Sequence, residues 1–273
     1  MSRDTLTTGE QVRAACRVGV WNGQTSGLAL GYAQANLAVL PEELAESFFD
    51  YCRRNPKPCP LLDMTDPGRV SLRRVAPKCD LRTDLPAYRI WEQGRLVNEP
   101  TDVIDRWRDD FVGFAIGCSF TFEAALLEAG IPVRHLELGR NVPMYRTNIP
   151  TTPAGVFQGP MVVSMRPLTS ADAQRAAEIT SHFPDVHGEP IQLGNPEKIG
   201  VMNLASPDFG EAVPIADDEI PVFWACGVTP QSAIMTAKPE VAITHSPGCM
   251  LVLDVTDAEI SDGGVSLIGD ENG

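Results

Sequence analysis

The stretch at residues 111–130, FVGFAIGCSFTFEAALLEAG, constrains the fold more than any other part of the chain. It opens with a short apolar run rich in aromatic and β-branched side chains, which predicts a buried strand. Gly117 permits a sharp turn, and Ser119 is a suitable N-cap for a helix. That helix, at 120–129, is apolar on nearly every face, so we expect a strand–turn–helix unit inside the core.

A second unit of this kind lies at 221–238. Its sequence PVFWACG predicts a strand, and Thr229 and Pro230 then suit the cap and first residue of a helix. If the two strands are neighbours in one parallel sheet, both helix N-termini open at its carboxyl edge, where ligands bind in open α/β sheets.

The segment between the two units has a different character. It predicts three short strands and a helix capped by Thr169. We therefore expect an α/β protein, with a discontinuous three-layer α/β domain and a smaller inserted α+β domain. The predicted domains are 1–130 with 221–273, and 131–220 between them. The three strands are predicted at 133–138, 143–147 and 161–165.

Other local patterns are clear in places. PEELAESFFDYCRRN, from Pro41, predicts an amphipathic helix, and YRIWEQGRLV predicts a hairpin with its turn near Gln93. The stretch at 21–40 mixes glycine with polar residues and is compatible with a short strand or with a loop over a pocket. The tail at 262–273 is predicted to be partly frayed.

Composition narrows the class of protein. The 273 residues are 43% hydrophobic, which allows a sizeable core, and the formal charge is −14. Such an acidic chain is a poor candidate for non-specific binding to nucleic acid or anionic membranes. The N-terminus lacks the apolar core of a signal peptide, and no apolar run approaches the length of a membrane span. Seven cysteines without a CxxC motif favour reduced thiols in a cytoplasmic protein.

The two predicted helix starts carry the first candidate chemistry. Backbone N–H groups and the helix dipole favour anions there, although two ordinary capped helices would give the same pattern. Cys118 at such a start could be a nucleophile with a lowered pKa, or a small residue packed at a tight turn. Thr229 and Ser119 are the corresponding hydroxyl groups, predicted to bind substrate.

Titratable side chains offer further candidates. Glu123 lies one turn after Ser119 and is either an acid/base or a structural partner for an arginine. His187 and His245 lie on Gly/Pro-bearing loops and could act as acid/base groups or be solvated. The histidines show no HxH or HExxH spacing, so no zinc site is predicted.

Three arginines could bind a carboxylate in bidentate fashion: Arg140, Arg146 and Arg166. Surface salt bridges would explain them equally well. The sequence contains no GxGxxG, GxxxxGK[ST] or GxSxG motif, which weakens dinucleotide binding, P-loop chemistry and the α/β-hydrolase nucleophile elbow.

Long blocks of the chain, in order, resemble the hydro-lyase family related to D-glutamate cyclase. The resemblance spans roughly residues 8–254. One position departs from the pattern, since Cys249 stands where a histidine is typical of the family. The blocks are TGEQVRAACRVGVWNGQTSGLALGYAQANLAVLP, GCSFTFEAALLEAGIPVRH, GRNVPMYRTNIP, GPMVVSMRPL, PVFWACGVTPQ and ITHSPGCMLVLD.

The resemblance implies a two-part α/β architecture and a lyase that acts on a small amino or carboxylic acid. The best-described activity of the wider family cyclises D-glutamate to 5-oxo-D-proline with loss of water. Cyclisation needs a base, an acid and stabilisation of an oxyanion, but no redox cofactor. The candidate catalytic residues are Glu123, Cys118, His187 and His245, and the candidate substrate-binding residues are Ser119, Arg146, Arg166 and Thr229.

Other functions remain open from the sequence. A non-catalytic protein could use the same pocket to bind a small anion for sensing or regulation, and a metal-assisted hydratase is a third hypothesis. We expect a small acidic substrate as the partner, with no cofactor, metal, nucleic acid or membrane. A homo-oligomer is compatible with a soluble enzyme, but the sequence carries no interface signature.

Overall fold

The computed structural model describes residues 5–261, so the predicted frayed tail lies outside the described residues. The larger of its two sheets has seven strands in the order β2-β5-β1-β10-β3-β4, and β11 also pairs with β1. All the described pairings in it are antiparallel. The strands are β1 Tyr32–Pro41, β2 Leu61–Met64, β3 Tyr88–Glu92, β4 Arg95–Asn98, β5 Phe111–Gly117, β10 Val241–His245 and β11 Leu251–Thr256.

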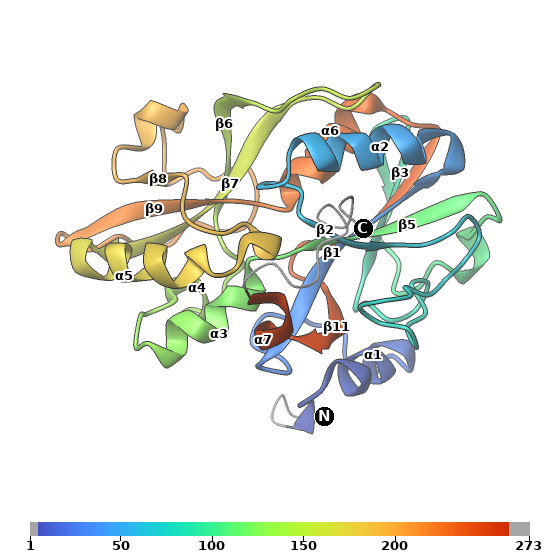
Figure 1. Ribbon diagram of the computed structural model, residues 1–273, viewed down its shortest axis with the longest axis horizontal. Coiled ribbons are helices and arrows are strands. Elements are labelled where there is room, and N and C mark those ends of the chain that lie inside the picture. The colour runs from blue at the N-terminus through green and yellow to red at the C-terminus, as the bar shows by residue number, and fades with distance from the viewer. Residues whose placement is uncertain (1–4, 262–273) are drawn as a thin grey trace, which may run out of the picture.

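The smaller sheet has the order β6-β7-β9-β8 and is also antiparallel. It lies with α3, α4 and α5 in the left half of Figure 1, and the larger sheet occupies the right half. Its strands are β6 Met144–Pro150, β7 Pro160–Thr169, β8 Gln192–Leu193 and β9 Glu219–Ala225.

Helices cover both sheets. α2 packs on β1 and β5, α5 packs on β7 and β9, and α6 packs on β7. The α-helices are α1 Gly9–Arg17, α2 Glu42–Arg54, α3 Phe120–Glu128, α4 Arg134–Glu137, α5 Ser170–Ser181, α6 Val228–Ala237 and α7 Asp257–Ile260. Short 3-10 helices are η2 Ile104–Arg106, η3 Pro184–Val186 and η4 Pro196–Ile199.

The mixture of helices and strands confirms the predicted α/β class. The opening strand–turn–helix unit is present as β5 and α3, and Thr169 caps α5 by accepting a hydrogen bond from the N–H of Asp172. The hairpin of β3 and β4 turns at Gln93 and Gly94, where both residues have positive φ.

Two local predictions are wrong, and the condition that the two buried strands share one parallel sheet is not met. The segment predicted as a strand at 133–138 is the helix α4, because its short apolar run also fits one helical turn. The helix after β9 has Gly227 as its N-cap rather than Thr229. The strands β5 and β9 lie in different antiparallel sheets and do not share a parallel one. The strand β9, expected in the larger unit, therefore pairs with β7 and β8.

β1 is the centre of the larger sheet and crosses the middle of Figure 1. It pairs with β5, β10 and β11, and nine of its ten residues are buried. Its sequence, YAQANLAVLP, contains two polar residues that are also buried, Gln34 and Asn36. Because buried polar groups need partners, these two side chains mark places where β1 meets other parts of the chain.

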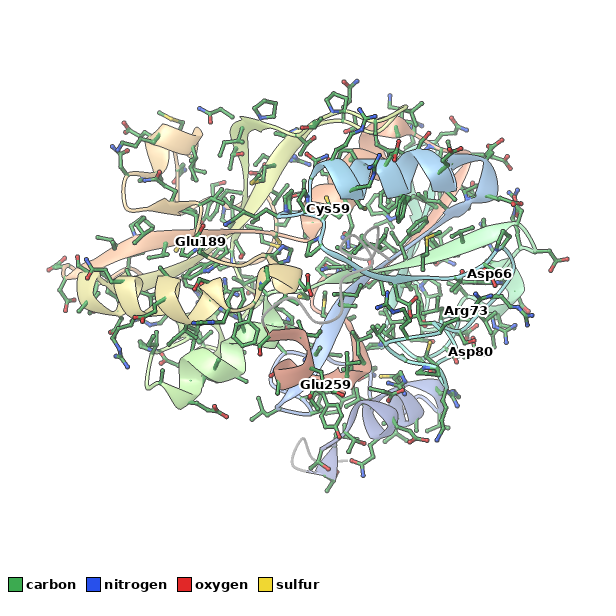
Figure 2. The ribbon with its side chains drawn as sticks, viewed as in Figure 1. Cys59, Asp66, Arg73, Asp80, Glu189 and Glu259 are labelled. Carbon is green, nitrogen blue, oxygen red and sulfur yellow. The ribbon has the colours of Figure 1, made fainter. Side chains whose placement is uncertain are left out.

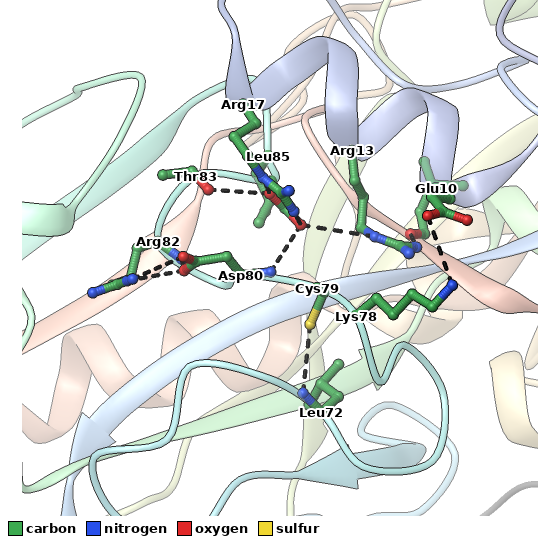
Figure 3. Close-up of polar contacts among 12 residues, drawn as sticks. Glu10, Arg13, Arg17, Leu72, Lys78, Cys79, Asp80, Arg82, Thr83 and Leu85 are labelled. Carbon is green, nitrogen blue, oxygen red and sulfur yellow. Dashed lines mark hydrogen bonds and ion pairs between the residues drawn. The ribbon is translucent and has the colours of Figure 1, made fainter.

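Buried charges attach α1 to the larger sheet. Arg13 donates to the carbonyl of Val252 at 2.8 Å and to Asp254 at 2.7 Å. Arg17 holds the fully buried carboxylate of Asp84 with two hydrogen bonds, at 2.8 and 2.7 Å. Figure 3 shows both arginines extending from α1 into this network. The helix is therefore tied to the last described strand, β11.

The connection from α2 to β3 is largely irregular, as its prolines predict, apart from β2. Cys59 is completely buried and lies beneath α2 in Figure 2. Asp66 and Arg73 form an exposed ion pair and lie near each other on the right-hand side of that view. Within residues 5–261, no helix is long and apolar enough to cross a membrane.

Candidate active site

A cavity of about 190 Å³ lies where the two sheets meet. The first residues of α3 and α6 line it, together with residues from β1, β3, β6 and the loop after β10. Its volume is below the roughly 300–1,000 Å³ of sites for drug-sized ligands, so we expect a small ligand. Of the predicted site residues, Cys118, Ser119 and His245 line this cavity.

The two strand–helix turns approach each other across Asn36 of β1. The Asn36 side chain donates to the carbonyl of Gly117 at 2.9 Å, at the end of β5. A Cβ atom at Gly227 would collide with that same side chain, and one at Gly117 would collide with the carbonyl of Asp185. Glycine is therefore required at both turns because other parts of the chain approach closely.

Each turn also places a thiol at a helix start. Cys118 and Cys226 both line the cavity and belong to one buried cluster. Burial raises the pKa of the Cys118 thiol well above its usual range, although a hydrogen bond from the N–H of Phe120 opposes this. Burial raises the pKa of Cys226 to about 11. Both are therefore neutral thiols at pH 7 that keep their hydrogen, so the lowered pKa predicted for Cys118 as a nucleophile is wrong.

His245 ends β10 and is held by main-chain and side-chain contacts. Its Nδ1 accepts a hydrogen bond from the N–H of Leu37 at 3.1 Å, and the amide of Gln231 lies 2.9 Å from the same atom. Burial lowers the pKa of His245 to about 4, and the charge of Arg89 contributes to the lowering. Because Nδ1 accepts from Leu37, the neutral imidazole carries its hydrogen on Nε2, which lies 3.1 Å from the Gln231 amide nitrogen.

Glu123 forms a buried ion pair with Arg166, which contacts the cavity residue Ser119. Nε and Nη2 of Arg166 both donate to Oε1 of Glu123, and Nε2 of His135 lies 3.1 Å from the same oxygen. Burial opposes ionisation of the carboxyl group, but His135 and Arg166 outweigh it and lower the pKa of Glu123 to about 2. Glu123 is therefore a carboxylate at pH 7, and the geometry fits the structural alternative for this residue.

Arg166 connects the buried Glu123 to Ser119 in the cavity lining. Its Nη2 donates to the hydroxyl of Ser119 at 3.1 Å, and its Nη1 donates to Ser164 at 3.1 Å. Its guanidinium also lies over the rings of Phe122 and Trp224, at 5.2 and 5.3 Å from their centroids. Such contacts satisfy a desolvated cation and fix its position. Arg166 therefore orients Ser119, although it does not itself line the cavity.

His187 lies in a separate depression beside Lys57 and Glu189. Its Nδ1 is 2.9 Å from the carbonyl of Lys57, and its backbone has a φ of 87°. Burial lowers the pKa of His187 to about 4. The structure does not place this histidine among the residues that line the cavity between the sheets.

Arg146 and Thr229 are also outside the cavity lining. Arg146 is half exposed and pairs with Asp208 at 3.0 Å. The Thr229 hydroxyl accepts from the N–H of Val162 at 2.9 Å and lies 3.2 Å from its carbonyl, so it fastens α6 to β7. Arg140, the third candidate arginine, donates to the carbonyl of Ala212.

Sequence reasoning missed four polar residues of the cavity: Asn36, Arg89, Asn141 and Gln231. Asn36 had a detectable signal, because an amide inside an otherwise apolar run is unusual for a central strand. Arg89 had none, since an arginine in a predicted hairpin normally faces solvent. In the part of the chain that the structure describes, no group of three or more His, Cys, Asp or Glu forms a potential metal site.

Comparison with known proteins identifies the family. The chain belongs to the D-glutamate cyclase family, whose model matches residues 112–254. The matched range begins in β5 and ends in β11, so it includes both helix starts and His245.

The relatives carry hydro-lyase names. A protein named "putative hydro-lyase" from Bordetella pertussis is 57% identical over 253 residues, covering 93% of this chain and 91% of the relative. A protein of the same name from Bacillus licheniformis is 58% identical over 250 residues, covering 92% and 95%. These names and the family support a lyase. Among solved structures, a nitrogen repressor-like protein from Methanococcus jannaschii matches with a TM-score of 0.38 at 10% identity, covering 90% of this chain and 99% of that one.

Proposed function

We propose that the cavity between the sheets is the active site of a lyase that removes water from a small amino or carboxylic acid. Cyclisation of D-glutamate to 5-oxo-D-proline is the first candidate reaction. The observation that carries the proposal is that two helix starts, each with a neutral thiol, meet a neutral histidine in one small cavity.

Cyclisation requires proton transfer in both directions. The substrate nitrogen attacks the carbon of the side-chain carboxylate, a C–N bond forms, and a C–O bond breaks. From the ammonium form, the nitrogen loses two protons and the departing oxygen gains two, so water leaves. His245 can accept one proton from nitrogen once its ring turns and frees Nδ1 from the N–H of Leu37, and Cys118 can donate one proton to oxygen. His245 then gives its proton to the leaving oxygen, and Cys118 regains one from nitrogen, so both groups end as they began.

Other groups of the site would stabilise and orient the reacting atoms. Backbone N–H groups at the starts of α3 and α6 favour the negative charge that develops on the attacked carboxylate. Ser119, held by Arg166, would position this end of the substrate. Because the cavity holds both ends of a flexible acid close together, it lowers the entropic cost of ring closure.

The test is to incubate the purified protein with D-glutamate, L-glutamate and related small acids and to follow products by NMR. We expect 5-oxoproline from one enantiomer of glutamate. His245→Gln and Cys118→Ala should each reduce turnover by about 10²–10⁴-fold, the usual contribution of one acid or base. His182→Gln, an exposed histidine at the end of α5, is the matched control.

The outcomes separate the functional classes. Tight binding of one acid without turnover would favour the hypothesis of an anion-binding regulatory protein over that of an enzyme. Full activity in both cavity variants would show that the reaction takes place elsewhere. Activity that disappears on chelation and returns with a divalent cation would favour the metal-assisted alternative.

A further inference from the structure

The polar groups of the cavity include one strong cation. Arg89 lies on β3, opposite Thr244 of β10, and its side chain reaches the cavity beside His245. We infer that Arg89 binds the carboxylate of the substrate that the reaction does not consume, and so selects α-carboxylic acids. This inference rests on the proposed function, because it assigns one end of the substrate in that site.

The charge around the cavity supports an anionic ligand. Among the described residues that line it, Arg89 is the one lysine or arginine, and none is an aspartate or a glutamate. The whole chain carries a formal charge of −14, so a cavity wall without carboxylates departs from the average surface. A single cation, whose partner carboxylate lies outside the cavity lining, favours a ligand with one negative charge at that end of a small, mainly apolar site.

The guanidinium of Arg89 has hydrogen-bonding capacity to spare. Its Nε is buried and donates no hydrogen bond within the described residues. The nearest carboxylate is that of Glu99, with Oε2 3.5 Å from Nε, which is too long for a good hydrogen bond. The Arg89 side chain is 26% exposed and that of Glu99 is 44% exposed, so water screens their attraction. A ligand carboxylate can therefore bind Arg89 without breaking a strong pair.

The backbone of Arg89 is well fixed. β3 pairs with β10 over five consecutive residues, from Tyr88 opposite His245 to Glu92 opposite Val241. The guanidinium and the imidazole of His245 thus come from paired neighbouring strands. An arginine fork on a rigid strand suits bidentate recognition of a carboxylate. The bound carboxylate would then leave the other end of the substrate for the thiols and helix starts.

This arrangement predicts a specific preference among ligands. D-glutamate and 5-oxo-D-proline both keep the α-carboxylate, so both should bind through Arg89. Isoglutamine, in which an amide replaces the α-carboxylate, should bind poorly although its side-chain carboxylate is intact. Loss of a charged, bidentate contact raises the dissociation constant by roughly 10- to 100-fold.

The experiment measures binding of D-glutamate, 5-oxo-D-proline and isoglutamine by titration calorimetry, and turnover of D-glutamate in parallel. The Arg89→Met variant should bind D-glutamate and 5-oxo-D-proline more weakly by that factor. It should bind isoglutamine about as well as the unmodified protein does. In the turnover assay, its KM should rise by a larger factor than its kcat falls. Arg89→Gln should behave in the same way if the methionine variant does not fold. Glu99→Gln should keep or tighten binding, and Arg95→Met, an exposed arginine on β4, is the matched control.

Failure of the inference can be told from failure of the function. If the unmodified protein converts D-glutamate and folded Arg89→Met or Arg89→Gln binds both acids equally well, Arg89 is not the carboxylate site and the proposed function stands. If the unmodified protein neither binds nor converts any of these acids, both proposals are wrong. Equal binding of glutamate and isoglutamine to the unmodified protein would also overturn the role of Arg89.

Discussion

At the scale of residues, the buried pair of Glu123 and Arg166 shows how one ionic contact can serve stability and the site together. Both side chains are nearly inaccessible to solvent, at 3% and 1%. The cost of removing two charges from water is offset only when every polar atom finds a partner. Here Arg166 also donates to Ser119 and Ser164, and Nε2 of His135 lies 3.1 Å from Oε1 of Glu123, so the same network orients a hydroxyl of the cavity.

Removal of one charge from this pair should destabilise the fold. We expect Glu123→Gln to lower the free energy of unfolding by about 3–5 kcal/mol, because Arg166 remains buried without its counter-charge. Denaturant unfolding followed by circular dichroism measures the change. Asp208→Asn, which breaks the exposed pair with Arg146, is the control and should cost about 0–1 kcal/mol. Equal effects in the two variants would contradict a structural role for Glu123.

A second residue-scale prediction concerns Gly227. Gly227→Ala should move the amide of Asn36, loosen the start of α6 and cost about 1–3 kcal/mol, because the new Cβ has no space. Gly23→Ala is the control, since its Cβ would make only ordinary contacts at 3.5 Å or more with Trp21. Thermal melting gives the stability, and a melt of the alanine variant that matches the unmodified protein would show that the turn can relax.

At the scale of elements, the sequence predicts correctly those hairpins and helix caps that depend on residues close together in the chain. The hairpin of β3 and β4 and the cap at Thr169 depend on neighbours in sequence, and both are present. The stretch at 21–40, which contains most of β1, is compatible with a strand or a loop because it mixes glycine with polar residues. The Asn36 amide donates to the carbonyl of Gly117, 81 residues away in the chain, and a local sequence pattern carries no sign of such a partner.

The candidate site was predicted in part for the same reason. Both helix starts and His245 follow recognisable strand patterns, so Cys118, Ser119 and His245 could be selected from the sequence. Whether β5 and β9 share a sheet depends on long-range pairing, which the strand–helix pattern does not encode. Arg89 reaches the cavity only because β3 pairs with β10 beside His245.

At the scale of the whole molecule, buried titratable groups make stability depend on pH. His187 and His245 have a pKa of about 4 in the fold and 6.5 when unfolded, so between these values the unfolded chain binds more protons. Stability should therefore be fully present above pH 6.5 and should fall as the pH drops towards 4. Asp257 acts in the opposite sense, because burial raises its pKa from 3.8 to about 7.

The net prediction is a loss of stability on acidification, since two histidines outweigh one aspartate. Free energies of unfolding measured from pH 8 to pH 4 should decrease, with a further loss below pH 4.5 as Glu123 protonates in the unfolded chain. His187→Gln should flatten the profile between pH 6.5 and 4. A profile that is level or rises towards pH 4 would show that these histidines are not neutral in the fold.

The central position of β1 has a consequence for folding during synthesis on the ribosome. β1 ends at residue 41, whereas its partners β10 and β11 begin at residues 241 and 251. At about 5–20 residues per second, the strand waits roughly 10 to 40 seconds for its last neighbour to be synthesised. During that time a ten-residue apolar strand lacks part of its pairing and can pair with another nascent chain. Rapid, crowded synthesis should therefore favour aggregation of this chain, and chaperones that bind exposed apolar segments should increase its yield.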